Sequence, residues 1–401
     1  MTAGEVHSRN DDAVEFAQGT LTMTGGKISG SYGIWNSGSG TRVLTLGKDD
    51  GTVSTTIPEI TVNSTGISTS IQTVNFYDGK VTNGSNLATR SGVNVPSGYK
   101  VVVNGTTATL AVEDPPIPTG FTHTEGTIET GYVIKNNTDN NEFVWIPVDD
   151  ISEFVREEGY QNNAKQSMLQ YCTEPYSYNG ATANATETAE YNAMISSVEE
   201  YKGFYIARYE ASQGTDGKAK SIKGKMPWTN IGWNNDNTMQ TQTGGAVEKA
   251  RAVYPVSSAT KGSAVSTLVY GVQWDRAVNY ITDGSEELKK DSRTFGNHKD
   301  SESFEYTKED GTTGTKTKDT GVKIPTGSDT TNRNQLKNVY DMAGNVYEWT
   351  MEAYYSNNRV LRGGSYAGSG ILYPVSVRDF SNGPSKATVG IGFRVALYIA
   401  E

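Results

Sequence analysis

Cysteine and histidine, the side chains most often used for redox chemistry and for binding transition metals, are scarce in this sequence. The chain of 401 residues contains one cysteine, Cys172, so it cannot form an intrachain disulfide. Its three histidines, His7, His123 and His298, are scattered without the spacing of a metal-binding motif. The sequence therefore gives no support to a catalytic zinc or iron centre.

Residues of another kind gather near the C-terminus, in three short motifs. The motifs read Asn338-Val-Tyr-Asp-Met-Ala-Gly-Asn-Val-Tyr-Glu-Trp349, Arg359-Val-Leu-Arg-Gly-Gly-Ser365 and Gly390-Ile-Gly-Phe-Arg-Val395. The paired glycines after Arg362 allow a positive φ or a close backbone approach, and Trp349 and Phe393 supply large side chains to bury. Together these features predict a loop that is held in place from both sides.

In this order, the three motifs resemble the formylglycine-generating-enzyme (sulfatase-modifying factor) branch of the C-type lectin fold. That branch has a Gly-Asn-Val-x-Glu-Trp run, then Arg-Val-x-Arg-Gly-Gly-Ser and a closing Gly-Phe-Arg. Further upstream, Phe143–Pro147 looks like the opening strand of the family, and Gly203–Glu210 looks like the strand that follows its first helix. The resemblance implies an α+β, C-type-lectin-like domain.

The residues needed for the known activities of this superfamily are missing. Formylglycine-generating enzymes use a pair of active-site cysteines for copper binding and redox chemistry, whereas this chain has one cysteine. Related sulfoxide synthases hold iron with three histidines in an additional helical domain, and neither that cluster nor that domain is present. We therefore expect no enzymatic activity, no catalytic residues and no required cofactor.

The resemblance also implies a structural calcium site. Family members often bind Ca²⁺ through an acid or amide, two backbone carbonyls and the motif glutamate, which here correspond to Asp341, Gly344, Val346 and Glu348. Hard oxygen ligands of this kind suit calcium. In many binding members of the superfamily the position is empty and the glutamate bonds to backbone, so the sequence leaves both arrangements open.

Between the second and third motifs, residues 366–389 show neither helical nor strand periodicity, which suggests a surface rather than a regular element. Their composition is also unusual. An AAC or AAT codon randomised at its adenines cannot encode Lys, Glu, Gln, Trp or Met, and from Arg362 to Arg394 only Lys386 belongs to this set. The rest of the chain uses these residue types freely.

This composition, between motifs of fixed type, resembles the variable proteins of diversity-generating retroelements. Those proteins use the C-type lectin fold to display a hypervariable loop surface near the C-terminus. The resemblance implies a non-enzymatic protein for ligand binding or adhesion, diversified by a retroelement. The alternative is an invariant formylglycine-generating-enzyme-like protein, a surface structural protein or an inactive enzyme homologue, with an unchanging Gly/Ser-rich loop.

Aromatic residues among small polar ones favour an adaptable binding surface, because a ring offers contact area at little entropic cost. We predict that ligand is bound by side chains of this loop, on a backbone held by Trp349, Arg362 and Phe393. Arg362 and Arg394 should pair inside the domain. The alternative for each aromatic residue is burial beneath the loop. The predicted ligand-binding residues are Tyr366, Ala367, Gly368, Ser369, Ile371, Leu372, Tyr373, Asp379, Phe380, Ser381, Asn382, Ser385 and Thr388.

The first part of the chain carries a loose repeat of strand, glycine turn and strand. Its copies are Thr20–Ser29, Leu44–Ser54 and Thr73–Thr82. Ile28, Val53 and Val81 hold matching places, 25 and 28 residues apart, which favours the coils of a parallel β-helix. A β-sandwich of similar hairpins is the alternative.

The proline-rich run Asp114-Pro-Pro-Ile-Pro-Thr-Gly120 predicts an extended linker. We therefore expect an all-β repeat domain at 1–114, a linker at 115–120 and a C-type-lectin-like ligand-binding domain at 121–401. Apolar residues at helical spacing predict helices at 186–201 and 272–282 within that domain. Residues 284–334, rich in charged and small polar residues, predict a surface insertion.

Charge and hydropathy limit the partners and the location. The formal net charge is −10 and no basic cluster stands out, which argues against nucleic acid. No apolar run is long enough for a membrane span, and Met1-Thr-Ala-Gly-Glu-Val6 is not a signal peptide. Short motifs at 51–56 and 76–80 resemble repeats in surface proteins of Gram-positive bacteria. We expect a bacterial cell-surface or extracellular protein, with export specified outside this chain, or alternatively a phage virion protein.

A protein on another cell, or on a phage or host surface, is the expected partner. Aromatic patches suit flat protein epitopes better than the polar edges of sugars, so a glycan is the less favoured alternative.

Overall fold

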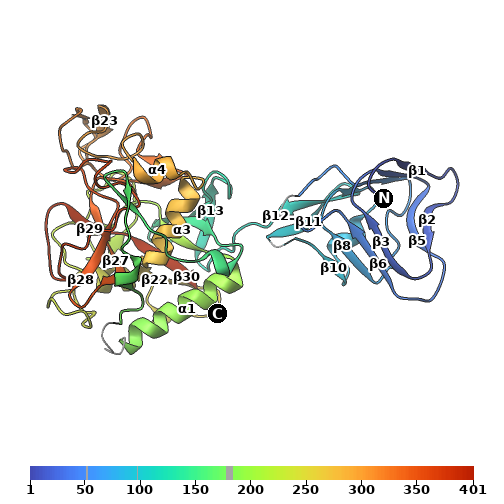
Figure 1. Ribbon diagram of the computed structural model, residues 1–401, viewed down its shortest axis with the longest axis horizontal. Helices are drawn as coiled ribbons and strands as arrows, with labels where there is room; N and C mark the ends of the chain where they lie inside the picture. Colours follow the sequence, from blue (N-terminus) through green and yellow to red (C-terminus); the bar gives the residue numbers. More distant parts are fainter. Residues whose placement is uncertain (51–52, 97, 178–183) are drawn as a thin grey trace. The chain divides into compact units, whose positions relative to one another are not determined.

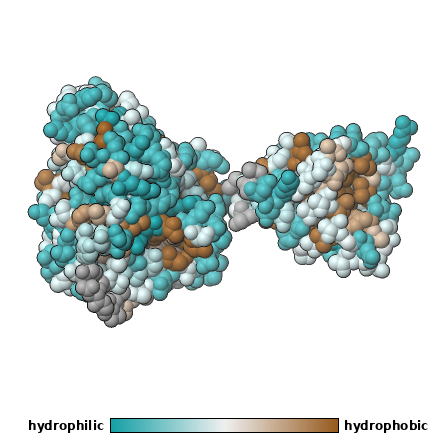
Figure 2. Space-filling model, in the orientation of Figure 1, coloured by the Kyte–Doolittle hydropathy of each residue, from teal (hydrophilic) through white to brown (hydrophobic). Residues whose placement is uncertain are grey.

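The computed structural model describes residues 1–50, 53–96, 98–177 and 184–401. The chain divides into two compact units, Met1–Asp114 and Pro115–Glu401 (Figure 1). The visible faces of both units carry hydrophilic side chains interrupted by smaller apolar patches (Figure 2). Within the described residues, no helix is both long and apolar enough to cross a membrane.

Parallel strands dominate the first unit. One sheet has the order β1-β4-β7-β9-β12-β11, in which the first four strands are parallel and β12 is antiparallel to both of its neighbours, β9 and β11. A second, parallel sheet has the order β10-β8-β6-β3, and β2 pairs with β5. The strands are β1 Glu5–His7, β2 Asp12–Phe16, β3 Gly19–Met23, β4 Lys27–Gly30, β5 Tyr32–Asn36, β6 Arg42–Leu46, β7 Glu59–Val62, β8 Thr73–Phe76, β9 Lys80–Val81, β10 Val93–Asn94, β11 Tyr99–Asn104 and β12 Thr107–Val112, with a short 3₁₀ helix at Ser85–Ala88.

The pairing of these strands can be compared with the hairpins expected of a β-sandwich. The consecutive strands β3 and β4 lie in different sheets, so the repeat is not built of hairpins and the β-sandwich alternative is wrong. The expected repeat register is also wrong at its middle copy. Ile60, not Val53, pairs with Ile28 on one side and Val81 on the other, because the strand after β6 begins only at Glu59. Gly51 and Thr52 of that copy lie outside the described residues.

The second unit is built around an antiparallel sheet with the order β13-β14-β15-β19-β30-β22. Its strands are β13 Phe121–Glu125, β14 Val133–Asn136, β15 Glu142–Pro147, β19 Gly203–Ala207, β22 Ala264–Leu268 and β30 Val395–Ile399. The strand expected at Phe143–Pro147 is β15. The strand expected at Gly203–Glu210 is β19, which ends at Ala207. A single large core packs around this sheet.

A smaller sheet carries the C-terminal motifs. Its strands β18 (Cys172–Thr173), β27 (Tyr347–Tyr354) and β28 (Asn358–Arg362) are antiparallel, and β29 (Ile391–Phe393) lies parallel to β27. The remaining strands form two-stranded pairs: β16 Tyr160–Gln161 with β17 Ala164–Lys165, β20 Ser212–Gln213 with β21 Ala219–Lys220, β23 Phe304–Thr307 with β24 Thr313–Lys316, and β25 Gln335–Leu336 with β26 Val339–Tyr340.

The helices of the second unit are α1 Ala185–Tyr201, α2 Gly245–Arg251, α3 Gly271–Ile281 and α4 Glu286–Lys290, with short 3₁₀ helices at Ile151–Glu153, Leu169–Tyr171 and Val256–Ser258. The two helices expected from apolar spacing are α1 and α3. The Asn184 side chain accepts hydrogen bonds from the first turn of α1, which therefore starts there. α1 packs against β19 and β30, and α3 packs against β15 and β27 (Figure 1).

Residues 284–334 are not the surface insertion that their polar composition predicts. The β23–β24 hairpin is largely exposed, but Phe295, Asn297, His298 and Ile324 are buried. The Asn297 side chain donates to the Val322 carbonyl and to the Asn345 side-chain oxygen, at 2.9 and 3.1 Å. Polar side chains here are buried because they bond to one another and to backbone, which composition alone does not reveal.

Candidate ligand-binding site

The framework of the predicted loop is fully buried. The Trp349 indole N–H donates to the Ile231 carbonyl at 3.0 Å, and the Phe393 ring packs 6.0 Å from that of Trp228. Arg394 binds both carboxylate oxygens of Glu348, at 2.7 to 3.1 Å. The two motif ends are thus joined by a buried ion pair.

The glycine pair after Arg362 turns the chain into the loop. Gly363 and Gly364 have φ of 84° and 75°, a region that residues with a Cβ atom seldom adopt. A Cβ atom on Gly364 would also clash with the Tyr373 carbonyl oxygen, which lies against this glycine. Glycine is therefore required here both by the turn and by the close approach.

All thirteen predicted ligand-binding residues lie at the surface at least in part. Ala367, Leu372, Ser381 and Ser385 are exposed, and Tyr366, Gly368, Ser369, Ile371, Tyr373, Asp379, Phe380, Asn382 and Thr388 are half-buried. Between them, every residue from Pro374 to Arg378 is buried. The expected continuous surface is therefore divided into a first lobe, residues 366–373, and a second lobe, residues 379–388, by a buried anchor, residues 374–378.

A network of buried charges holds the anchor. The Arg378 guanidinium binds both oxygens of Glu352, at 3.0 and 3.1 Å, and also pairs with Asp275. Arg362 donates to Asp275 at 2.6 Å and to the Ser376 carbonyl at 3.1 Å. Burial opposes ionisation of Asp275, but the two guanidinium groups outweigh it and lower its pKa. As expected, Arg362 pairs inside the domain rather than facing the surface.

Separate hydrogen bonds brace the two lobes. In the first, Asp300 accepts from the Ser369 hydroxyl at 2.7 Å and from the Gly370 amide at 2.8 Å. In the second, Asp379 accepts from the Ser381 amide and hydroxyl at 2.9 and 2.6 Å. These bonds fix the backbone of both lobes while their side chains stay at the surface.

The aromatic residues of the lobes rest on rings of the framework. Tyr373 packs edge-to-face on Tyr347 with ring centroids 6.0 Å apart, and Phe380 stacks on Tyr354 at 4.1 Å. Both ring pairs are half-buried. Phe380 and Tyr373 therefore keep one side against the fold and present the other to solvent, which is neither full burial nor free exposure.

Three tyrosines that sequence reasoning missed extend this surface. Tyr171, Tyr354 and Tyr355 form a cluster with Phe380, in which Tyr171 and Tyr355 lie 5.0 Å apart and Tyr354 and Tyr355 lie 4.6 Å apart. The adjacent Tyr354-Tyr355 pair before a polar turn is a signal that could have been noticed. Tyr171 directly precedes β18, and it reaches this aromatic cluster because β18 pairs with β27.

Tyr355 has a strained backbone. It lies in the turn between β27 and β28 with φ of 50°, a left-handed conformation that is unusual for a bulky residue. Such strain persists where the surroundings over-determine it, and it often marks functional surfaces. Here the turn directs the Tyr355 ring onto Tyr354 and Tyr171.

Of the two carboxylates of the expected calcium site, Glu348 is fully paired and Asp341 is paired through one oxygen. Both oxygens of Glu348 are bound to Arg394, so a cation there would compete with a guanidinium group. Asp341 is buried, which raises its pKa to about 6, and one of its oxygens accepts from Gly327 and Thr326 at 2.7 and 2.9 Å. Across the described residues, no group of three or more His, Cys, Asp or Glu side chains is arranged to hold a metal. In this arrangement the Glu348 carboxylate is held by Arg394, whereas the second oxygen of Asp341 is buried without a hydrogen-bond partner, so the calcium site at Asp341, Gly344, Val346 and Glu348 stays a prediction.

The cysteine and the histidines of the second unit lie in unrelated surroundings. Cys172 is buried, and burial raises the pKa of its thiol to about 12. His298 is buried beneath the first lobe, and burial lowers its pKa to about 4. His123 stacks on Tyr132 with ring centroids 3.9 Å apart.

Comparisons with known proteins agree with the C-terminal motifs. No curated protein matches the chain. Among solved structures, Treponema denticola variable protein 1 matches with 16% identity and a TM-score of 0.32, over 65% of this chain and 96% of that one. The Major Tropism Determinant M1 variant matches with 13% identity and a TM-score of 0.26, over 79% of this chain and 86% of that one. Neither similarity is close enough to carry a functional conclusion.

The match to a family model is of a different kind, because it covers more than half of the chain. The sulfatase-modifying factor enzyme 1-like domain matches residues 152–399, which include all three C-terminal motifs and both lobes. The chain therefore belongs to the FGE-sulfatase family, and its second unit has the C-type lectin fold of that family.

Proposed function

We propose that this protein binds ligands without catalysis, through a variable surface formed by the two lobes of its C-terminal loop. The observation that carries the proposal is the division of this loop. Thirteen residues lie at least partly at the surface, whereas the anchor between them is fixed by a buried network of charges. Substitutions in the lobes can therefore change contacts with a ligand at little cost to the fold.

The half-buried rings support binding on energetic grounds. A ring that already packs on a framework ring loses little rotamer freedom when a ligand covers its other side. Tyr373 on Tyr347 and Phe380 on Tyr354 have this arrangement. We include Tyr171, Tyr354 and Tyr355 in the proposed surface, because they are continuous with Phe380 and partly exposed.

The surroundings of Cys172 favour binding over the redox chemistry of formylglycine-generating enzymes. That chemistry needs a cysteine pair, and the only cysteine is buried as a neutral thiol.

Sequencing of the gene across isolates tests the variability of the surface. We expect substitutions at codons for the first and second lobes, and no substitutions at the anchor, at Trp349 or at Phe393. A nearby reverse-transcriptase gene with an adenine-rich copy of this segment would identify a retroelement as the source of these substitutions. Identical lobes in all isolates, or substitutions spread evenly over the chain, would favour the invariant structural protein instead.

Binding itself can be tested on whole cells. Fluorescently labelled protein is added to a panel of bacterial strains, and the bound fraction is compared with that of the triple variant Tyr366→Ala, Tyr373→Ala and Phe380→Ala. We expect the variant to lose binding at little cost in melting temperature, because each ring keeps only one side against the fold. Proteinase treatment of the cells should remove the binding and periodate oxidation of glycans should not, because we propose a protein ligand. The opposite pattern would identify a glycan.

For the first unit, we propose that its parallel strands are coils of a β-helix, on a bacterial surface or a phage virion. The bridge between Ile34 and Ile67 supports this, because it continues the β2–β5 ladder as a third face beside the two parallel sheets. An experimental structure in which these three ladders do not follow one helical path would contradict the proposal.

A further inference from the structure

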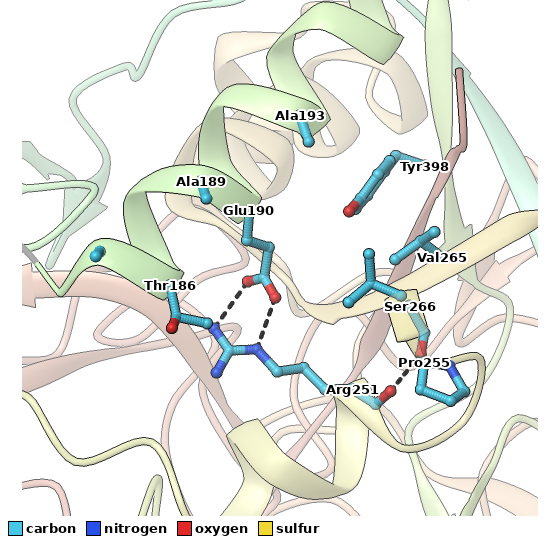
Figure 3. Close-up of a pocket in the computed structure, with 11 residues that line it drawn as sticks. Thr186, Ala189, Glu190, Ala193, Arg251, Pro255, Val265, Ser266 and Tyr398 are labelled. Carbon is cyan, nitrogen blue, oxygen red and sulfur yellow. Dashed lines mark hydrogen bonds and ion pairs between the residues drawn. The ribbon is translucent and has the colours of Figure 1, made fainter. Parts of the chain in front are cut away.

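A cavity of about 630 Å³ opens in the second unit between α1, α2 and the edge of the large sheet (Figure 3). Its volume lies within the range of roughly 300–1,000 Å³ that is typical of small-molecule sites. The described residues that line it include none from the two lobes or from the three C-terminal motifs. The cavity is thus separate from the proposed ligand-binding surface.

The walls of the cavity are apolar. On one side, Ala189 and Ala193 of α1 face the open space, and on the other lies Val265 of β22 (Figure 3). Val256, which is 68% exposed, also lines the cavity. Solvent-facing positions of a helix usually carry polar side chains, as Asn192 does in α1. The alanines keep this space open, since longer side chains would fill it.

One end of the cavity is polar but carries no net charge. Arg251 binds Glu190 through two hydrogen bonds, of 2.6 and 3.0 Å, and Gln242 accepts a further bond from Arg251 at 2.6 Å. The hydroxyl of Tyr270 donates to Glu190 at 2.8 Å. This ion pair is therefore already satisfied within the fold, and it leaves no free charge for a ligand ion.

The hydroxyl of Tyr398 differs from these groups. Tyr398 is only 5% exposed, and its hydroxyl is directed into the cavity (Figure 3). Among the described residues, this hydroxyl has no hydrogen-bond partner. Burial and the nearby Glu190 carboxylate raise the pKa of Tyr398 to about 12, so the hydroxyl keeps its proton at neutral pH. A protonated hydroxyl beside an open apolar groove is a donor that a ligand can satisfy.

We propose that this cavity binds a small, uncharged organic molecule with an apolar body and one hydrogen-bond acceptor. The body lies between Ala189, Ala193 and Val265, and the acceptor receives the hydrogen bond of Tyr398. A charged ligand is disfavoured because the Arg251–Glu190 pair is closed and its two charges cancel.

Benzophenone is a suitable probe, since it has two apolar rings, one carbonyl acceptor and the ability to label nearby C–H groups under ultraviolet light. We expect saturable labelling of peptides that carry the lining residues of α1 and β22. Ala189→Phe should abolish this labelling by filling the cavity. Asn192→Phe, the same change at an exposed position outside the lining, should leave it intact, and circular dichroism should show both variants folded.

Tyr398→Phe tests the polar half of the site. The loss of one hydrogen bond should weaken benzophenone binding roughly threefold to tenfold, while diphenylmethane, which lacks the carbonyl, should bind wild type and variant equally. Labelling that does not saturate, or that persists in folded Ala189→Phe, would overturn the cavity as a binding site. Equal affinity of wild type and Tyr398→Phe for benzophenone would overturn the assigned role of the hydroxyl.

Discussion

Arg378 shows at the scale of one residue how the loop, whose surface we propose to be variable, is held in the fold. It lies in the middle of the loop, yet its side chain is buried against Glu352 and Asp275. A buried ion pair is weak evidence of net stabilisation, but breaking one is costly because it leaves charges without partners. The neighbouring Asp379 is half-exposed and starts the second lobe.

Arg378→Met should therefore lower the free energy of unfolding by about 3–5 kcal/mol. Lys386→Met is the matched control, because it removes an exposed positive charge from the same loop and should change stability by less than about 0.5 kcal/mol. Urea denaturation of both variants measures the difference. Similar losses in the two variants would mean that the anchor does not hold the loop.

His298 makes stability depend on pH. Burial lowers its pKa from 6.5 to about 4, so the folded state binds the proton less readily than the unfolded chain. The contribution of neutral His298 to the free energy of unfolding is fully present above pH 6.5, and it is lost as the pH falls towards 4. The loss amounts to roughly 3 kcal/mol, at about 1.4 kcal/mol per pKa unit.

The effect of His298 must be separated from that of buried carboxyl groups. Burial raises the pKa of Asp341 to about 6, which stabilises the fold at low pH and acts in the opposite direction. The free energy of unfolding of wild type minus that of His298→Asn should therefore be compared at pH 7 and pH 4. We expect this difference to fall by roughly 3 kcal/mol. A difference that stays constant would show that His298 does not titrate as described.

At the scale of elements, the β27–β28 hairpin joins the loop to the rest of the smaller sheet. Its strand β27 carries both Tyr347, beneath Tyr373, and Tyr354, beneath Phe380. Its turn carries Tyr355 with φ of 50°. One hairpin thus supports an aromatic residue of each lobe and adds a ring of its own.

Two substitutions at Tyr355 separate its backbone from its ring. Both Tyr355→Asn and Tyr355→Ala remove the ring, but only asparagine adopts the left-handed conformation readily. Tyr355→Asn should therefore be more stable than Tyr355→Ala by about 1 kcal/mol in urea denaturation. Equal stabilities would mean that the turn is not held in this conformation. If the ring belongs to the binding surface, both variants should bind target cells less well than wild type.

At the scale of the whole molecule, the buried Arg394–Glu348 ion pair links the first and third C-terminal motifs. We propose that the second unit needs no calcium. An ion that binds only the folded state would raise the melting temperature, and the increase would be larger for tighter binding. Titration with calcium and then EGTA should leave the melting temperature unchanged, and a reversible increase with calcium would restore the expected site.

The sequence by itself determined those features that depend on local pattern. Apolar spacing located α1 and α3, and the three C-terminal motifs identified the family and the C-type lectin fold. The same motifs bounded the loop whose lobes lie at the surface. These predictions succeed because helical periodicity, glycine turns and motif order are properties of short segments.

Only the tertiary structure decided which side chains of the loop are buried, because the loop has no periodicity from which to infer burial. It placed Arg378 inside and Asp379 at the surface, although they are adjacent. It paired Ile60 rather than Val53 with Ile28, and it brought Tyr171 to Tyr355 across the β18–β27 pairing. The cavity beside Tyr398 likewise exists only where α1, α2 and β22 meet. Contacts between distant segments depend on how whole elements pack, and no short stretch of sequence records that packing.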